Sequence, residues 1–201
     1  MTAVPILMTP VPDGATGRAE GGTAVAVVGP VGPAAATHTC DGEPVTVSGS
    51  GTINGTSGRD VIRGSSGSDI IDGRGGNDVI CAGGGVDAVY GGQGADRIFG
   101  EGGDDFLWGE GLGVVVTGGA DEIWGGTGDD TIYGQVGGDT LRGNEDNDDI
   151  YGGDGPDTIF GGINMAETSG AQLDACYGNT GNDTIRSWLT GHPNECEVVV
   201  D

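Results

Sequence analysis

Residues 125–142 read GGTGDDTIY GQVGGDTLR, two consecutive units of nine residues with the same internal order. In each unit a glycine-rich stretch leads to Asp at the sixth position and an apolar residue at the eighth: Asp130 and Ile132, then Asp139 and Leu141. Glycine reaches positive φ without steric cost, so the first six residues favour a turn. The last three favour a short strand whose central side chain faces inward, because successive strand side chains point to opposite sides.

The nine-residue phase extends from Gly55 to Arg186 through thirteen units, with insertions within 109–124 and 161–177. One unit cannot bury its single apolar side chain alone, but stacked units can, as in solenoid proteins. We therefore expect two short parallel sheets around an apolar column. The sixth position is always aspartate: Asp60, Asp69, Asp78, Asp87, Asp96, Asp105, Asp121, Asp130, Asp139, Asp148, Asp157, Asp174 and Asp183. The eighth is apolar: Ile62, Ile71, Ile80, Val89, Ile98, Leu107, Ile123, Ile132, Leu141, Ile150, Ile159, Cys176 and Ile185.

Composition excludes several classes of function. The chain has 46 glycines and a net charge of −24, from 31 acidic and 7 basic residues. Such a chain lacks the basic surface that binds nucleic acid, and an anionic membrane surface repels it. No apolar run reaches the ~18 residues of a membrane-spanning helix, so we expect no membrane insertion. Glycine costs about 1 kcal/mol at each helix-interior position, which argues against a helical bundle.

The stacked turns would place aspartates in rows, for example Asp60 over Asp78, about 5 Å apart at the usual strand spacing. Carboxylates so close repel unless a cation lies between them. Ca²⁺ takes six to eight oxygen ligands from carboxylates and carbonyls in flexible geometry, whereas Mg²⁺ demands stricter octahedral geometry. Zn²⁺ prefers His and Cys, and the chain has only 2 His. The pattern therefore favours calcium.

The units GGQGADRIF (91–99), GGTGDDTIY (125–133) and GGDGPDTIF (152–160) resemble the RTX nonapeptide, the haemolysin-type calcium-binding repeat. The resemblance covers residues 55–186. It implies an all-β, right-handed parallel β-roll in which Asp carboxylates and backbone carbonyls of one turn share Ca²⁺ with the turn eighteen residues on. Several calcium ions per chain, folding on calcium binding and export from the cell are implied as well.

Carried onto this sequence, the resemblance predicts a ligand set at the sixth and fourth positions of the units. The expected carboxylates are Asp60, Asp69, Asp78, Asp87, Asp96, Asp105, Asp130, Asp139, Asp148, Asp157 and Asp183. The expected glycines are Gly58, Gly67, Gly76, Gly85, Gly94, Gly103, Gly128, Gly137, Gly155 and Gly181. Asp121 and Asp174 are not included, because insertions displace the glycines before them. Asp146 replaces the fourth-position glycine before Asp148 and is expected either to distort that turn or to add a ligand.

No catalytic motif accompanies the repeats: the sequence has neither H-E-x-x-H nor G-x-S-x-G. We therefore expect a non-enzymatic calcium-binding protein. Two alternatives stay open. One is a calcium-stabilised cell-surface or adhesive protein. The other is a secreted hydrolase, for which Glu110, Glu122 and Glu167 are the only candidate groups beyond the repeat carboxylates.

The regions outside the repeats suggest caps and a leader. We expect a disordered leader or signal segment at 1–36, where Ala34–Ala36 resembles a signal-peptidase site, an N-terminal cap at 37–54 and a C-terminal cap at 187–201. Thr46–Asn54 has the appearance of a degenerate unit. Four cysteines allow three pairings, of which we favour Cys40–Cys81 and Cys176–Cys196, one at each end of the rod. Paired cysteines suggest an oxidising, extracellular location.

Aromatic residues recur at the ninth position, facing outward. If both insertions are simple loops, alternate units share a sheet, and one face carries a ladder formed by Tyr90, Trp108, Tyr133, Tyr151 and Tyr177. Cross-strand stacking that stabilises the sheet is one interpretation, and a binding face for a glycan or a protein partner is the other. If residues 109–117 instead form a degenerate unit with Val116 inward, the later aromatics move to the other face.

Overall fold

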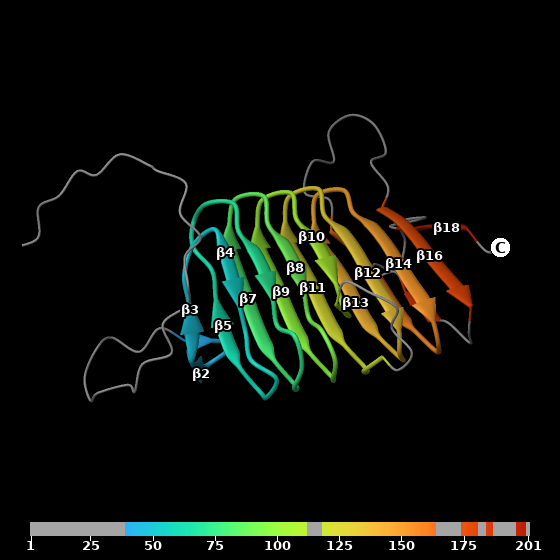
Figure 1. Ribbon diagram of the computed structural model, residues 1–201. Helices are drawn as coiled ribbons and strands as arrows, with labels where there is room; N and C mark the ends of the chain where they lie inside the picture. The colour runs from blue at the N-terminus through green and yellow to red at the C-terminus, as the bar shows by residue number, and fades with distance from the viewer. Residues whose placement is uncertain (1–38, 112–117, 164–173, 181–183, 187–195, 200–201) are drawn as a thin grey trace, which may run out of the picture.

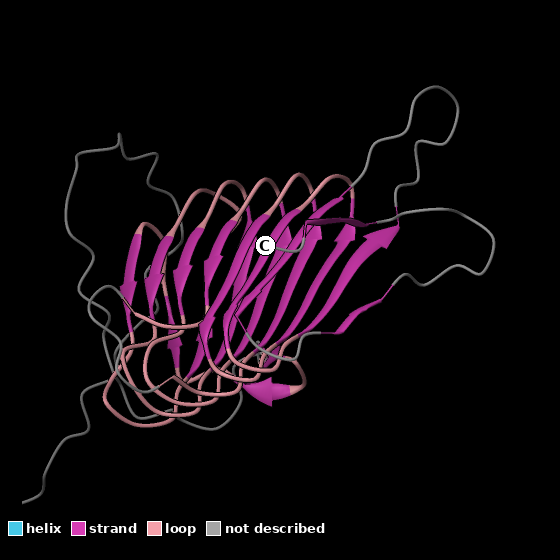
Figure 2. Ribbon diagram, turned by 90° about the vertical axis from the view of Figure 1, so that its right-hand side faces the viewer, coloured by secondary structure: helices cyan, strands magenta, loops and turns pink. Residues whose placement is uncertain are grey.

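The computed structural model describes residues 39–111, 118–163, 174–180, 184–186 and 196–199. It is an all-β solenoid in which two parallel sheets face each other (Figures 1 and 2). From β3 to β18 the chain alternates between the sheets, so that each strand pairs with the strands two before and two after it, except at the ends of the sheets. The described residues contain no helix, and hence none that could span a membrane. The predicted fold class is confirmed.

Each sheet has eight strands. One sheet consists of β4 (Thr52–Asn54), β6 (Ile70–Asp72), β8 (Ala88–Tyr90), β10 (Phe106–Trp108), β12 (Thr131–Val136), β14 (Asp149–Asp154), β16 (Asp174–Thr180) and β18 (Cys196–Val199). The other consists of β3 (Val47–Ser48), β5 (Val61–Arg63), β7 (Val79–Gly84), β9 (Arg97–Gly102), β11 (Glu122–Thr127), β13 (Thr140–Glu145), β15 (Thr158–Ile163) and β17 (Thr184–Arg186).

Both insertions leave the strand register intact. Across the first, Leu107 of β10 is opposite Ile132 of β12, and across the second, Ile150 of β14 is opposite Cys176 of β16. No additional strand lies between these pairs. The interpretation of both insertions as simple loops is confirmed, and the alternative register with an extra unit at 109–117 is wrong. Residues 112–117, including Val116, lie outside the described part of the chain.

The core is a single column of eighth-position side chains between the sheets. From Ile62 to Cys176 these side chains are completely buried, and Val47 and Ile53 extend the column toward the N-terminus. Each strand from β3 to β16 contributes an apolar side chain from its inward face, as the three-residue pattern predicts. Ile185 lies among residues whose side chains are not described. Such a narrow core buries little apolar surface per residue, so the turns must contribute to stability.

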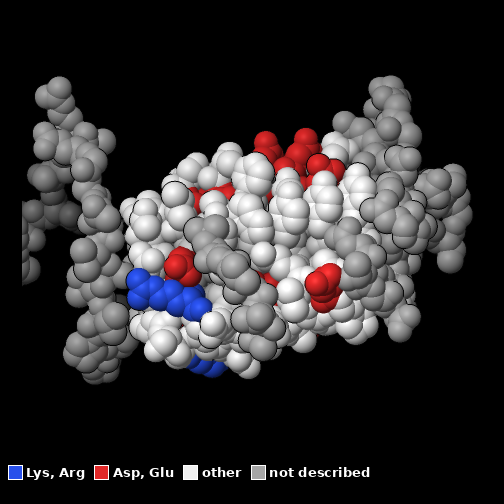
Figure 3. Space-filling model, turned by 45° about the vertical axis from the view of Figure 1, so that its right-hand side comes forward, with Lys and Arg blue, Asp and Glu red and all other residues white. Residues whose placement is uncertain are grey.

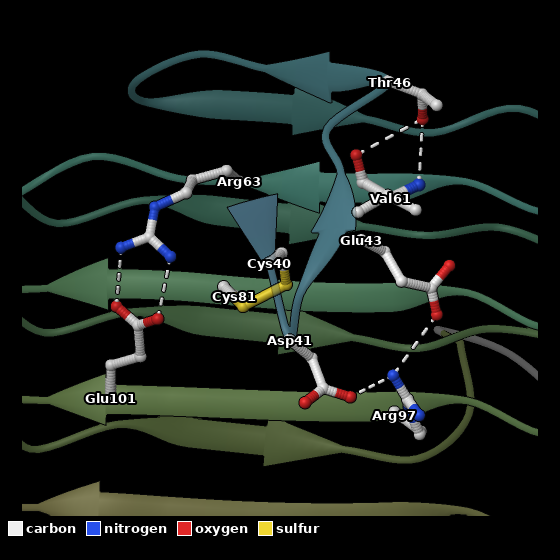
Figure 4. Close-up of a disulfide and its surroundings, with 9 residues drawn as sticks. All are labelled: Cys40, Asp41, Glu43, Thr46, Val61, Arg63, Cys81, Arg97 and Glu101. Carbon is white, nitrogen blue, oxygen red and sulfur yellow. Dashed lines mark hydrogen bonds and ion pairs between the residues drawn. A yellow bond between two sulfur atoms is a disulfide. The ribbon is translucent and has the colours of Figure 1, made fainter. Parts of the chain in front are cut away.

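A small hairpin covers the outer face of the sheet at the N-terminal end (Figure 4). Its strands, β1 (Thr39–Cys40) and β2 (Glu43–Pro44), are antiparallel, and Cys40 packs with Val61, Val79 and Cys81 in a second apolar cluster. Arg97 forms ion pairs with Asp41 and Glu43 of the hairpin.

The predicted Cys40–Cys81 disulfide fixes this hairpin to the sheet, across a sequence separation of 41 residues. Closing a loop of that length restricts the unfolded chain and stabilises the fold by about 4 kcal/mol. Cys176 is also disulfide-bonded. The side chain of Cys196 lies outside the described residues, so the pairing Cys176–Cys196 stays a prediction.

The two expected caps contain strands of the roll itself. Within 37–54, β3 pairs with β5 and β4 pairs with β6, so the sheets begin at Val47. Within 187–201, β18 adds a strand beside β16. The expected leader, 1–36, lies outside the described residues.

Candidate metal sites

The sixth-position aspartates form two continuous ladders, one along the turns that precede each sheet. In each ladder the backbone N–H of one aspartate donates a hydrogen bond to Oδ1 of the next. Asp60 donates to Asp78 at 2.7 Å, and Asp78 donates to Asp96 at 2.8 Å. The same bonds run from Asp69 through Asp148 and Asp157, at 2.8–3.0 Å. The predicted stacking of carboxylates is therefore present, and one oxygen of each carboxylate is fixed by the backbone.

The second carboxylate oxygen is buried and, through the middle of the ladders, accepts no hydrogen bond. This holds for Oδ2 of Asp78, Asp87, Asp96, Asp105, Asp121, Asp130 and Asp139. The side chains of these residues are about 1% exposed. A buried oxygen with no partner carries a desolvation cost, and an ionised carboxylate carries a larger one. These oxygens therefore have the environment of metal ligands.

Backbone oxygens approach the same points. A Cβ atom added to Gly100 would lie 2.5 Å from Oδ2 of Asp105 and 2.5 Å from the carbonyl oxygen of Gly125. At Gly134 the corresponding distances are 2.6 Å to Oδ2 of Asp139 and 2.5 Å to the carbonyl oxygen of Gly152. Each carboxylate oxygen thus lies beside a carbonyl of the following turn. Two acceptor oxygens so close to one another favour a cation near them.

The fourth-position glycines allow the turns to stack closely. Gly94 has φ of 123°, and a Cβ on it would lie 1.8 Å from the carbonyl oxygen of Gly76. The same close approach to a carbonyl occurs at Gly103, Gly137 and Gly155. Gly58 and Gly67, in the first two units, make no such contact, because their nearest neighbour is a hydroxyl at 4.0 Å.

The N-terminal members of the ladders differ from the rest. Oδ2 of Asp60 accepts bonds from the Thr56 backbone N–H at 2.6 Å and the Thr56 hydroxyl at 2.9 Å. Oδ2 of Asp69 is bonded in the same way by Ser65, at 2.7 and 2.9 Å. In these two units a hydroxyl side chain therefore donates to Oδ2, whereas the Oδ2 atoms from Asp78 to Asp139 accept no hydrogen bond. Asp60 and Asp69 belong to the predicted ligand set, but they do not need a cation to compensate for burial.

Burial raises the carboxyl pKa values along the ladders. Desolvation is the main cause at each residue, and it outweighs the backbone hydrogen bonds, which lower the pKa. The pKa rises from 3.8 to about 6 for Asp96, to about 7 for Asp78, Asp130 and Asp139, and to about 8 for Asp105 and Asp121. The pKa of Asp87 is raised for the same reason. Without a cation, the folded state therefore resists ionisation of these groups near neutral pH.

This has a testable consequence for the metal-free chain. The folded pKa values, about 6–8, exceed the unfolded value of 3.8, so the folded state binds more protons between these limits. The stabilisation is complete below about pH 4 and is lost as the pH rises toward 8. Circular dichroism in a chelator should thus show more β structure at pH 5 than at pH 8. An unchanged spectrum, or less structure at pH 5, would contradict the assignment of these carboxyls as buried and unpaired.

Asp121 belongs to the ladder, although it was not among the predicted ligands. It accepts a hydrogen bond from the Asp96 N–H and donates one to Asp139, like the other members. Its constant spacing from Ile123 is the signal that identifies it. Asp146 has φ of 75°, and its exposed side chain accepts a bond from Gly128 N–H at 3.1 Å, so it does not enter the ladder. The predicted ligands Asp183 and Gly181 lie outside the described residues.

A second buried carboxylate, besides Asp121, was not predicted as a ligand. Glu110 is fully buried, and desolvation raises its pKa from 4.5 to about 7.

Exposed acidic side chains gather along an edge of the roll (Figure 3). Within the described residues, no point is surrounded by three or more Asp, Glu, His or Cys side chains. A cation in these turns would therefore be held by a mixture of carboxylate and carbonyl oxygens.

The predicted aromatic ladder is present on one sheet. Tyr90, Trp108, Tyr133, Tyr151 and Tyr177 stack in succession, with ring centroids 4.6–5.8 Å apart and interplanar angles of 5–10°. On the other sheet, Phe99 stacks on Trp124, and the Arg142 guanidinium lies over the rings of Trp124 and Phe160.

Comparison with known families agrees with this geometry. A sequence model of the RTX calcium-binding nonapeptide repeat (four copies) matches residues 46–80, 82–111, 114–141, 133–163 and 170–187. These matches together cover about two thirds of the chain. No curated protein matches the sequence.

Proposed function

Because the chain belongs to the RTX calcium-binding nonapeptide repeat family, we propose that its turns bind several calcium ions and that this binding drives folding of the roll. The observation that supports this most strongly is the row of buried Oδ2 atoms, from Asp78 to Asp139, that accept no hydrogen bond. Each is one carboxylate ligand beside a backbone carbonyl. Hard oxygen ligands of this kind, with flexible geometry, suit Ca²⁺ better than Mg²⁺ or Zn²⁺.

The proposed ligands are the carboxylates of Asp78, Asp87, Asp96, Asp105, Asp121, Asp130 and Asp139, with carbonyls of the turns on either side. Asp148, Asp157 and Asp183 extend the set toward the C-terminus. The carbonyls are those of the fourth-position glycines, together with the first glycine of each following turn. Asp60 and Asp69 are the weakest members, because Thr56 and Ser65 already satisfy their oxygens.

Folding and calcium binding are coupled in this proposal. Without calcium, the ladders bring like charges together in a protein with a net charge of −24, and the core is a single column of side chains. A chain with high net charge and little apolar surface to bury stays disordered. Calcium removes the repulsion, so the ordered roll is the calcium-bound state.

We propose that the protein works outside the cell. Extracellular modules bind calcium with dissociation constants of about 10⁻⁴–10⁻³ M, so such sites fill at extracellular calcium levels and stay empty in the cytosol. The Cys40–Cys81 disulfide supports an oxidising compartment. Export before folding would follow from the same difference in calcium concentration.

A surface or adhesive role remains the second candidate, and the aromatic ladder is the observation that bears on it. The rings stack face to face along the sheet, so each inner ring uses both of its faces on its neighbours. Sugars that stack on aromatic faces would find only the edges of these inner rings. The geometry supports a stabilising role for the ladder more than a binding role. We propose no enzymatic activity.

A paired substitution tests the ligand assignment. Asp105→Asn keeps the shape and the Oδ1 acceptor but removes the charge beside the Gly125 carbonyl. Asp104→Asn, at the exposed neighbouring residue, is the control. Calorimetric titration of the full chain should show that Asp105→Asn weakens calcium binding at least tenfold at one or two sites, while Asp104→Asn leaves the titration unchanged. Equal titrations for the two variants would contradict the assignment.

A further inference from the structure

Glu110 is a buried acidic side chain that the repeat pattern does not require. It occupies the second position of the unit interrupted by the first insertion, and it is the one glutamate among the buried polar residues of the described chain. Its Oε2 accepts a hydrogen bond from Val136 N–H at 3.2 Å, and its own N–H donates to Oε1 of Gln135 at 3.0 Å. Its Oε1 is buried and accepts no hydrogen bond.

Glu101 shows what a glutamate does at the same position of a regular unit. It adopts φ of 72°, and its side chain is 36% exposed and paired with Arg63 at 2.8 Å. Glu110 does not have a positive φ, and its side chain turns inward. No arginine forms an ion pair with it within the described residues. The interrupted unit thus holds a carboxylate inside the roll, where the preceding unit directs one to solvent.

The surroundings of Glu110 Oε1 are oxygen-rich. A Cβ on Gly118 would lie 2.2 Å from this oxygen and 1.4 Å from the carbonyl oxygen of Val136, so the two oxygens are close neighbours. The carboxylate also experiences charge repulsion from Asp96, Asp121 and Asp139. Backbone N–H groups offset only part of the cost of this additional negative group, because burial still raises its pKa and no arginine within the described residues pairs with it.

We propose that Glu110 is a ligand of a calcium site that the regular repeats lack, with its Oε1 and the Val136 carbonyl oxygen as two ligands between the turns ending at Asp121 and Asp139. This inference rests on the proposed function. Among the described units, Glu110 is the one that adds a buried side-chain carboxylate at the second position. A greater ligand charge strengthens calcium binding, so this site fills before the regular ones.

The test compares the wild-type chain with Glu110→Gln, and with Glu101→Gln as the control at the same position of the preceding unit. Calorimetric titration with CaCl₂ should show one ion fewer for Glu110→Gln, with the tightest phase missing, and no change for Glu101→Gln. Chemical unfolding at several calcium concentrations gives an independent readout. Stability depends on ligand concentration with a slope proportional to the number of ions bound, so the slope should fall by one ion.

The outcomes distinguish a failure of the proposed calcium-binding function from a failure of the proposed Glu110 site. If the wild-type chain binds no calcium, the proposed function fails and the inference fails with it. If the wild-type chain binds several ions and Glu110→Gln binds as many with the same affinities, only the inference is overturned. A lower stability with an unchanged slope would show a structural role and would also overturn it. If Glu110→Gln does not fold in calcium, Glu110→Asp replaces it: a weakened tightest phase supports the proposal, and an unchanged one overturns it.

Discussion

Withdrawal of calcium should convert the folded roll into a largely disordered chain at pH 7.5. Each ion bound at an extracellular concentration contributes about 1 kcal/mol to folding, and several ions together approach the roughly 5–15 kcal/mol that stabilises a typical domain. The core is one column of side chains, and it offers little apolar burial to offset the repulsion of the ladders.

Far-ultraviolet circular dichroism and the hydrodynamic radius, measured with and without a chelator, provide the test. The chelated chain should lose its β signal and expand, and excess CaCl₂ should restore both. Excess MgCl₂ is the control for ionic strength and divalent charge, and it should not restore the fold. A chain that keeps its spectrum and its radius in chelator would show that the roll folds on its core alone.

The second large effect concerns the backbone contact between turns. Gly94→Ala places a Cβ 1.8 Å from the Gly76 carbonyl oxygen, at a residue with φ of 123°. Strain of this kind costs up to about 3 kcal/mol, and the forced separation of two turns that share a calcium site adds to it. We expect the unfolding free energy in calcium to fall by at least about 3 kcal/mol, measured by urea titration.

Gly67→Ala is the matched control for this prediction. Gly67 occupies the same position of an early unit, but it does not have a positive φ, and the nearest neighbour of a Cβ added there is the Ser65 hydroxyl at 4.0 Å. Its replacement should change stability by no more than about 0.5 kcal/mol. Equal losses in the two variants would indicate that glycine is needed for local flexibility and not for the approach of stacked turns.

Much of the fold follows from the nine-residue phase. The invariant Asp and the apolar side chain two residues later predict the turn, the strand and the buried column. The lengths of the insertions leave the register open, because loops and an additional unit are both compatible with the spacing. The strand pairing of Leu107 with Ile132 settles that question, since hydrogen bonding between distant strands depends on three-dimensional contact.

The sequence predicts the details of the candidate site less completely than it predicts the fold. The repeat pattern gives no reason to distinguish one sixth-position aspartate from another. In the structure, however, the second-position hydroxyls of Thr56 and Ser65 donate hydrogen bonds to two of these carboxylates. Glu101 and Glu110 have the same place in the unit and opposite environments. Glu101 has a positive φ and Glu110 does not, and the repeat pattern carries no signal that separates them.

The most direct test of this account is the number of calcium ions bound to the full chain. Equilibrium dialysis at about 1 mM free calcium, a concentration at which extracellular modules are occupied, with metal analysis of the protein, gives that number. The account predicts several ions per chain, bound together with the gain of β structure. A count of no more than one or two ions would mean that the buried carboxylates of the ladders are not calcium ligands.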